Sequence, residues 1–151
     1  AEVDVDKVMQ GSCVARLDIF DRGVMTSRSI ERARRRYARA QAAVSCSPSA
    51  LALADGACDA VVVAFTAHEI RDERARELFF LELRRILLPG GKVVLVEHVR
   101  DVMNLIVFGP GCLHFLPRAE WLRLAARTDL RVASETRITP WVTALALEKA
   151  A

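Results

Sequence analysis

This chain lacks any cysteine motif for metal binding or redox chemistry. Its four cysteines, Cys13, Cys46, Cys58 and Cys112, are too widely spaced for a Cys-x-x-Cys pair or a zinc-type cluster. The pattern therefore predicts buried or half-buried free thiols. A reducing compartment, the cytoplasm, is expected for such a protein.

Long apolar runs are also lacking. Although 52% of the residues are hydrophobic, no uninterrupted stretch approaches the about 18 residues that a membrane-spanning helix needs. Residues 1–7 alternate acids with valine, which does not predict a secretory signal. With 151 residues available to bury a core, the sequence predicts a soluble globular chain of one domain, with no membrane partner.

Motifs for covalent or metal catalysis are missing as well. There is no Gly-x-Ser-x-Gly sequence, which argues against a serine hydrolase of that type. The chain has three histidines, and they are isolated in sequence at His68, His98 and His114. With no cysteine pair to join them, a metal site is not expected.

Charge is nearly balanced, since the formal net charge is only +3. The positive charge is nevertheless concentrated in residues 28–39, where six arginines crowd one helical segment. A nucleic-acid groove is one interpretation, but Tyr37 is the only aromatic residue among these arginines that could stack on a base. A solvated helix face is the favoured interpretation, so a nucleic-acid partner is not expected.

The most informative segment is 55–97. It contains Asp55-Gly56-Ala57-Cys58-Asp59, an apolar run over 60–65, an amphipathic stretch after Arg71, the break Leu88-Pro89-Gly90-Gly91 and a second apolar run over 92–97. This order predicts a strand, a crossover helix and a parallel strand. The helix is expected to bury Phe79 and Leu83 and to point Arg76 outward.

The flanking segments predict further α/β elements. On the N-terminal side we expect a strand over 13–20, a helix capped by Thr26 or Ser27, and a short strand over 42–46. On the C-terminal side we expect a helix over 117–127 and an antiparallel hairpin formed by 130–139 and 141–148. The segment 98–117 between them contains Phe108-Gly109-Pro110-Gly111 and cannot be regular throughout.

This order of parts resembles the class I S-adenosylmethionine-dependent methyltransferases, from about residue 16 to residue 149. The resemblance rests on Asp-Gly-x-x-Asp before the first strand of the unit, Leu-Pro-Gly-Gly before the second, and the closing hairpin. It implies a Rossmann-like open α/β sheet with helices on both faces and S-adenosylmethionine as the cofactor. It also implies that residues 1–151 are one methyltransferase-like domain, incomplete at its N-terminus.

A glycine-rich turn is the expected part that this sequence does not show. In the resembled family a Gly-x-Gly-x-Gly turn precedes the ribose-binding acid, because glycine lets the backbone approach the cofactor closely. Here only Gly11 precedes Asp18. Either the chain begins downstream of the turn, or the residues are absent from this sequence, or the protein has lost it. We favour a missing segment.

The resemblance implies cofactor contacts at three strand ends. Asp18 or Asp21 would accept hydrogen bonds from the ribose hydroxyls, and spacing does not decide between them; each could instead cap a turn. Ser47 and Pro48 stand where many relatives have the Asp-Ala pair that meets adenine, and an ordinary Ser-Pro turn is the alternative. At the third strand end, Ala64 and Phe65 would line the methionyl and sulfonium region.

Residues that would frame the methyl acceptor follow the second strand of the unit. His98 or His114 could remove a proton from the acceptor, although both could be structural. His68 is expected to pack beneath its loop or to cap the next helix, and a role in proton transfer is the alternative. The apolar segment 103–115 suggests an acceptor pocket or a lid.

The leading hypothesis is methyl transfer to a small, apolar organic acceptor. Such a displacement requires collinear alignment and exclusion of water more than a dedicated nucleophile. A catalytically silent methyltransferase-like binding module is the main alternative, because the glycine-rich turn is missing. An NAD-dependent oxidoreductase would share the ribose acid, but the closing hairpin argues against it, and RNA methylation is a further variant.

Overall fold

The computed structural model describes residues 14–36 and 43–150. Within these ranges the chain forms both helices and strands. In chain order they are β1 (Leu17–Asp18), α2 (Arg28–Arg36), β2 (Val44–Ser45), β3 (Cys58–Ala64), the 3-10 helix η1 (Ala67–Glu69), α3 (Glu73–Ile86), β4 (Leu87–Glu97), α4 (Val102–Phe108), the 3-10 helix η2 (Gly109–His114), α5 (Arg118–Arg127), β5 (Leu130–Thr139) and β6 (Val142–Lys149).

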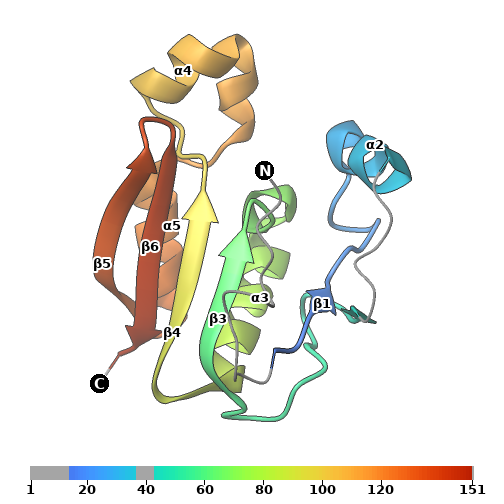
Figure 1. The fold of residues 1–151 in the computed structure, drawn as a ribbon, viewed down its shortest axis with the longest axis vertical. Helices are drawn as coiled ribbons and strands as arrows, with labels where there is room; N and C mark the ends of the chain where they lie inside the picture. The colour runs from blue at the N-terminus through green and yellow to red at the C-terminus, as the bar shows by residue number, and fades with distance from the viewer. Residues whose placement is uncertain (1–13, 37–42, 151) are drawn as a thin grey trace.

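The main sheet has four strands in the order β3-β4-β6-β5 (Figure 1). Strands β3 and β4 are parallel, with Val63 opposite Leu95. Strand β6 is antiparallel to both β4 and β5. The predicted strand–helix–strand unit and the closing antiparallel hairpin are therefore confirmed.

Local sequence signals explain how the crossover from β3 to β4 is built. Asp72 caps α3 by accepting a hydrogen bond from the backbone N–H of Ala75 at 2.7 Å. The Pro-Gly-Gly sequence that follows α3 lies inside β4, where Gly90 adopts a positive φ of 79°. A Cβ on Gly91 would lie 3.0 Å from the backbone oxygens of Cys58 and Asp59, so only glycine lets β4 approach β3 this closely.

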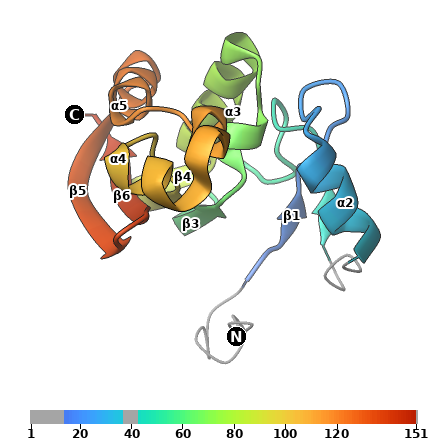
Figure 2. The ribbon, with the colours of Figure 1, turned by 90° about the horizontal axis from the view of Figure 1, so that it is seen from above.

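Helices α3 and α5 lie side by side against one face of this sheet and bury the core (Figure 2). Phe80 is fully buried and stacks on Trp121 of α5, with ring centroids 6.2 Å apart. The sequence-based prediction for Arg76 was wrong, because this side chain is buried instead of exposed. Its guanidinium donates to the backbone carbonyl of Ile70 at 2.5 Å, which fixes the chain between η1 and α3.

Strands β1 and β2 form a separate parallel pair, in which Asp18 lies opposite Ser45. They are shorter than predicted, and in the described ranges no strand links this pair to β3 (Figure 1). Cys13, Gly11 and Tyr37, which the sequence analysis singled out, lie outside the described residues. On the outer face of β3 the side chain of Val62 is 70% exposed.

The segment between β4 and α5 forms α4 and η2 and lies beyond the C-terminal end of β4 (Figure 1). Asp101 caps α4 by accepting from the backbone N–H of Asn104 at 2.8 Å, and Gly109 ends it with a positive φ of 55°. None of the helices in the described part of the chain combines the length and apolarity that crossing a membrane requires.

Candidate active site

Glu97, the last residue of β4, organises the loop that follows β3. The residue is only 2% exposed, and its Oε1 accepts hydrogen bonds from the backbone N–H groups of Thr66 and Ala67 at 3.1 and 2.9 Å. Its Oε2 lies 2.6 Å from Nδ1 of His68. The sequence analysis did not predict these contacts of Glu97, although parallel neighbours end at the same sheet edge and would have brought it beside this loop.

The pKa of His68 is strongly shifted from its ordinary value. Burial by itself lowers the pKa of His68, but hydrogen bonds and charges from Glu69 and Glu97 outweigh burial and raise this pKa to about 9. Burial also favours the neutral form of Glu69, yet the neighbouring His68 and then His114 hold the pKa of Glu69 at about 2. The prediction that His68 packs beneath its loop agrees with its 6% exposure.

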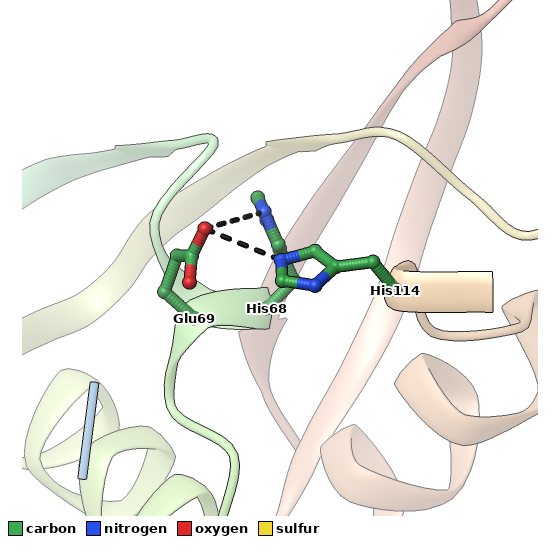
Figure 3. A group of neighbouring side chains, drawn as sticks. All are labelled: His68, Glu69 and His114. Carbon is green, nitrogen blue, oxygen red and sulfur yellow. Dashed lines mark hydrogen bonds and ion pairs between the residues drawn. The ribbon is translucent and has the colours of Figure 1, made fainter. Parts of the chain in front are cut away.

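His114 joins His68 and Glu69 from η2 (Figure 3). Its Nε2 lies 3.3 Å from Oε1 of Glu69, and its ring contacts the guanidinium of Arg71. The same guanidinium donates to the backbone carbonyl of His114 at 2.9 Å. Burial, followed by the positive charge of Arg71, lowers the pKa of His114.

His98 lies in a different setting, an aromatic cluster at the C-terminal ends of β3 and β4. Its ring centroid is 5.0 Å from those of Phe65 and Phe108 and 4.9 Å from that of Phe115. Its Nδ1 lies 2.9 Å from the backbone carbonyl oxygen of Trp141. Because a carbonyl only accepts, Nδ1 carries the proton in this bond and Nε2 is the basic nitrogen.

Ala64 is the last residue of β3, and Phe65, which follows it, belongs to this cluster. Phe65 adopts a φ of 51°, which a bulky side chain rarely does, and 45% of its surface is exposed. Its backbone N–H donates to the carbonyl of Val96 at 2.9 Å, so β4 holds the strained residue in place. Strain of this kind, about 1–3 kcal/mol, is concentrated at functional sites.

The two candidate ribose acids differ in their surroundings. Asp18, at the end of β1, is half-buried and binds the guanidinium of Arg34 through both carboxylate oxygens at 2.9 and 2.8 Å. That guanidinium also lies 4.2 Å above the ring of Phe20. Asp21 accepts from the backbone N–H of Gly23 at 2.7 Å, and Asp18 accepts from that of Phe20 at 3.2 Å, so both carboxylates make a turn-type hydrogen bond.

Ser47 and Pro48 lie close to Asp18, since the backbone N–H of Cys46 donates to the carbonyl of Asp18 at 3.1 Å. Ser47 Oγ accepts from the backbone N–H of Ser49 at 3.2 Å, so a Ser-Pro turn is present. The predicted residues therefore fall into two groups. One group surrounds the ends of β1 and β2, and the other surrounds the ends of β3 and β4.

Comparison with known proteins decides the family. A family model described as a methyltransferase domain matches residues 16–95, which is more than half of the chain. The chain belongs to this methyltransferase family. This confirms the resemblance drawn from the sequence, and with it S-adenosylmethionine as the cofactor of this methyltransferase domain. No curated protein sequence matches the chain.

Solved structures support the fold. An S-adenosylmethionine-dependent methyltransferase from Methanosarcina mazei superimposes with a TM-score of 0.63 at 17% identity, covering 99% of this chain and 87% of the other. One from Aquifex aeolicus gives 0.62 at 16% identity, covering 87% and 65%. A 1,6-didemethyltoxoflavin-N1-methyltransferase from Burkholderia thailandensis gives 0.65 at 14% identity, covering 95% and 64%. This methyltransferase domain thus spans about two thirds of the last two chains.

The chemical groups of these residues suit an adenosyl cofactor, but one arginine already binds the carboxylate that would hold the ribose. Asp18 offers a carboxylate at a strand end, and the backbone at Ser47 and Pro48 lies next to it. Phe65 offers an exposed apolar wall at the end of β3. Arg34, however, occupies both oxygens of Asp18 in this structure, so the ribose hydroxyls would have to share or replace that ion pair.

Proposed function

We propose that this protein transfers the methyl group of S-adenosylmethionine to a small, apolar organic acceptor. Membership of the methyltransferase family supports the reaction class. The observation that supports the acceptor class is the position of His98, a basic nitrogen surrounded by the rings of Phe65, Phe108 and Phe115 at one sheet edge. The proposal also takes residues 1–151 as one domain that acts in the cytoplasm.

Helix α4 supports an apolar acceptor. Six of its seven residues are apolar and exposed, with Val102 and Ile106 exposed by 71% and 72%. A large exposed apolar surface of this kind is typical of a binding site. Because Phe108 of this helix contacts His98, the same surface borders the proposed reaction site.

His98 would act as the general base. The bond to the carbonyl of Trp141 orients its ring and leaves Nε2 to take a proton from an oxygen or nitrogen of the acceptor. His114, the other histidine considered, does not take this role in the proposal, because Glu69 and Arg71 already contact its ring. The aromatic cluster would exclude water from the reacting atoms.

The cofactor would lie along the strand ends. S-adenosylmethionine supplies an activated methyl carbon when it is bound. Asp18 would accept hydrogen bonds from its ribose hydroxyls, backbone groups at Ser47 and Pro48 would meet the adenine ring, and Ala64 and Phe65 would line the sulfonium end. The Burkholderia enzyme, which was crystallised with 1,6-didemethyltoxoflavin and S-adenosylhomocysteine, supports a small-molecule acceptor by analogy.

A catalytically silent binding module is the second candidate function. The observation in its favour is the bidentate ion pair between Arg34 and Asp18, which provides hydrogen bonds to both carboxylate oxygens without any ligand. Such a protein would keep the fold and bind no S-adenosylmethionine.

Calorimetry separates the two functions. The full chain is titrated with S-adenosylmethionine up to millimolar concentration, together with the variants Asp18→Asn and Asp21→Asn. Loss of a hydrogen bond to a charged group costs about 1.5–3 kcal/mol, so Asp18→Asn should weaken binding at least about tenfold. Asp21→Asn is the matched control and should bind as the unchanged protein does. Absence of binding by the unchanged chain would refute the proposal and favour the silent module.

A transfer assay tests the acceptor and the base. Small phenols and aromatic amines are offered with labelled S-adenosylmethionine, and His98→Asn is compared with Arg123→Ala, an exposed change on α5. Removal of a general base should lower the rate about 10²–10⁴-fold, whereas Arg123→Ala should not change it. An equal rate in His98→Asn would exclude His98 as the base.

A further inference from the structure

His68, Glu69 and His114 form a cluster that methyl transfer does not use (Figure 3). The first two belong to η1 and the third to η2, 45 residues further along the chain than Glu69. Each contributes one nitrogen or oxygen atom, and these atoms all lie within 4.8 Å of one another. The isolated positions of the histidines in sequence gave no sign of this arrangement.

We propose that these three side chains bind a divalent metal ion of the zinc type. Two imidazoles and one carboxylate are a common ligand set for zinc, with the remaining position left to water. The inference goes beyond the proposed methyl transfer, and neither depends on the other.

Two of the three separations in this cluster match the spacing of ligand atoms around a metal ion. Oε1 of Glu69 lies 3.5 Å from Nε2 of His68 and 3.3 Å from Nε2 of His114. Charge-assisted N–H···O bonds are usually about 2.7–2.9 Å long, so both separations are long for such bonds. Ligand atoms arranged as a tetrahedron around an ion with bonds of about 2.1 Å are separated by roughly 3.4 Å.

Glu69 provides a second, independent observation. Its side chain is only 9% exposed, and its Oε2 has no hydrogen-bond partner in the described structure. Leaving a buried carboxylate oxygen without a partner is costly, more so than for a neutral polar group. A bound cation would satisfy this oxygen, either directly or through a coordinated water.

Glu97 supplies the support that ligating histidines usually have. In metal sites the second ring nitrogen of the histidine commonly donates to a carboxylate, which fixes the tautomer and the ring orientation. Nδ1 of His68 lies 2.6 Å from Oε2 of Glu97, which is 2% exposed. The other nitrogen, Nε2, faces Glu69.

Arg71 is the competing cation. Its guanidinium contacts the ring of His114, so binding of an ion requires this side chain to turn away from the ring. Arg71 is exposed and can do so without disturbing the core. A bound ion would tie η1 to η2 and thereby hold the segment after β4 over the end of β3.

Zinc binding to the full chain tests the site. The protein is treated with a chelator, dialysed, and equilibrated with Zn²⁺ at defined free concentrations, and bound metal is measured by mass spectrometry. Co²⁺ replaces Zn²⁺ in a parallel sample, in which tetrahedral nitrogen and oxygen ligation gives visible absorption bands. We expect one ion per chain and a rise in melting temperature with zinc, because ligand binding stabilises the folded state.

Variants decide whether the three named residues hold the ion. Glu69→Gln and His114→Ala should weaken zinc binding at least about 100-fold, and Glu97→Gln about 10–100-fold. His98→Ala is the matched control, because this histidine lies in the aromatic cluster and should leave zinc binding unchanged. His114 is only half-buried, so His114→Ala tests the site even if Glu69→Gln fails to fold.

Three results would overturn the site. The first is that the unchanged chain binds no zinc in stoichiometric amount. The second is that His114→Ala binds as tightly as the unchanged chain. The third is that His98→Ala loses zinc together with the cluster variants. Because calorimetry with S-adenosylmethionine is a separate measurement, failure here leaves the proposed function standing, and the reverse also holds.

Discussion

Glu82 and Arg85 of α3 form an ion pair at 2.8 Å, and both side chains bind the loop that leads into β3. Glu82 Oε2 accepts from the backbone N–H of Leu51 at 2.7 Å, and Arg85 donates to the carbonyl oxygens of Leu51 and Leu53 at 3.0 and 2.8 Å. One turn of helix therefore satisfies the backbone groups of a loop that has little regular structure of its own.

This pair predicts a pH dependence of stability. The hydrogen bond from Arg85, with a contribution from the backbone N–H of Leu51, lowers the pKa of Glu82 in the folded protein. Stability from this group is thus present above its unfolded pKa of about 4.3 and is lost as the pH falls through the lower folded value. Glu82→Gln should cost about 1 kcal/mol at neutral pH and much less in acid, measured by urea unfolding.

Glu120→Gln is the control for that experiment. Glu120 also pairs with an arginine three residues on, Arg123 at 2.8 Å, but both side chains are more exposed and hold no loop. Its loss should change stability by no more than about 0.5 kcal/mol. Equal effects of the two substitutions would contradict the role given to Glu82.

The contact between α3 and α5 predicts a large core effect. Phe80 is fully buried against Trp121, so Phe80→Ala should reduce the free energy of unfolding by about 3–5 kcal/mol. Leu88→Ala is the comparison, because Leu88 is 41% exposed and its loss should cost far less. Urea unfolding followed by circular dichroism measures both, and a small effect at Phe80 would show that the two helices do not share a core.

The backbone conformation of Phe65 predicts an unusual order of stability among variants at this position. Glycine normally destabilises relative to alanine, but at a φ of 51° it avoids the steric penalty that any Cβ suffers. Phe65→Gly should therefore be more stable than Phe65→Ala by about 1 kcal/mol in denaturant titrations. If Phe65→Ala is the more stable variant, the left-handed conformation is not present in solution.

The pairing of Arg34 with Asp18 predicts competition with the cofactor. Arg34→Ala removes the guanidinium that binds both oxygens of Asp18, so S-adenosylmethionine should bind severalfold more tightly in calorimetry. Arg35→Ala serves as the neighbouring control on α2 and should leave the affinity unchanged. Weaker binding in Arg34→Ala would mean that this arginine contributes to the cofactor site.

Much of the fold could be predicted because local signals agreed with the tertiary structure. The apolar runs that became β3 and β4, the helix between them and the closing hairpin all follow from periodicity and turn residues. Arg76 was wrongly expected to be exposed because arginine is a charged residue. In the structure it is buried, and its guanidinium donates to the backbone carbonyl of Ile70. Periodicity describes which face a residue is on, and it does not reveal a backbone group that needs a donor.

The candidate site was predictable only where it follows strand ends. Asp18, Phe65 and His98 lie at such ends, as the sequence analysis expected. The grouping of His68 with His114 could not be predicted, because it depends on how the segment between β4 and α5 folds back. No spacing rule connects residues that meet through two 3-10 helices far apart in the chain.

The free edge of β3 has a consequence for handling the protein. Within the described ranges β3 has a hydrogen-bonded neighbour on one side only, and its seven residues carry a single charge, at Asp59. An edge strand with so little charge and an exposed Val62 is a template for another strand. Wherever this edge is uncovered, concentrated samples should self-associate through it, and Val62→Lys should keep them monomeric in light scattering.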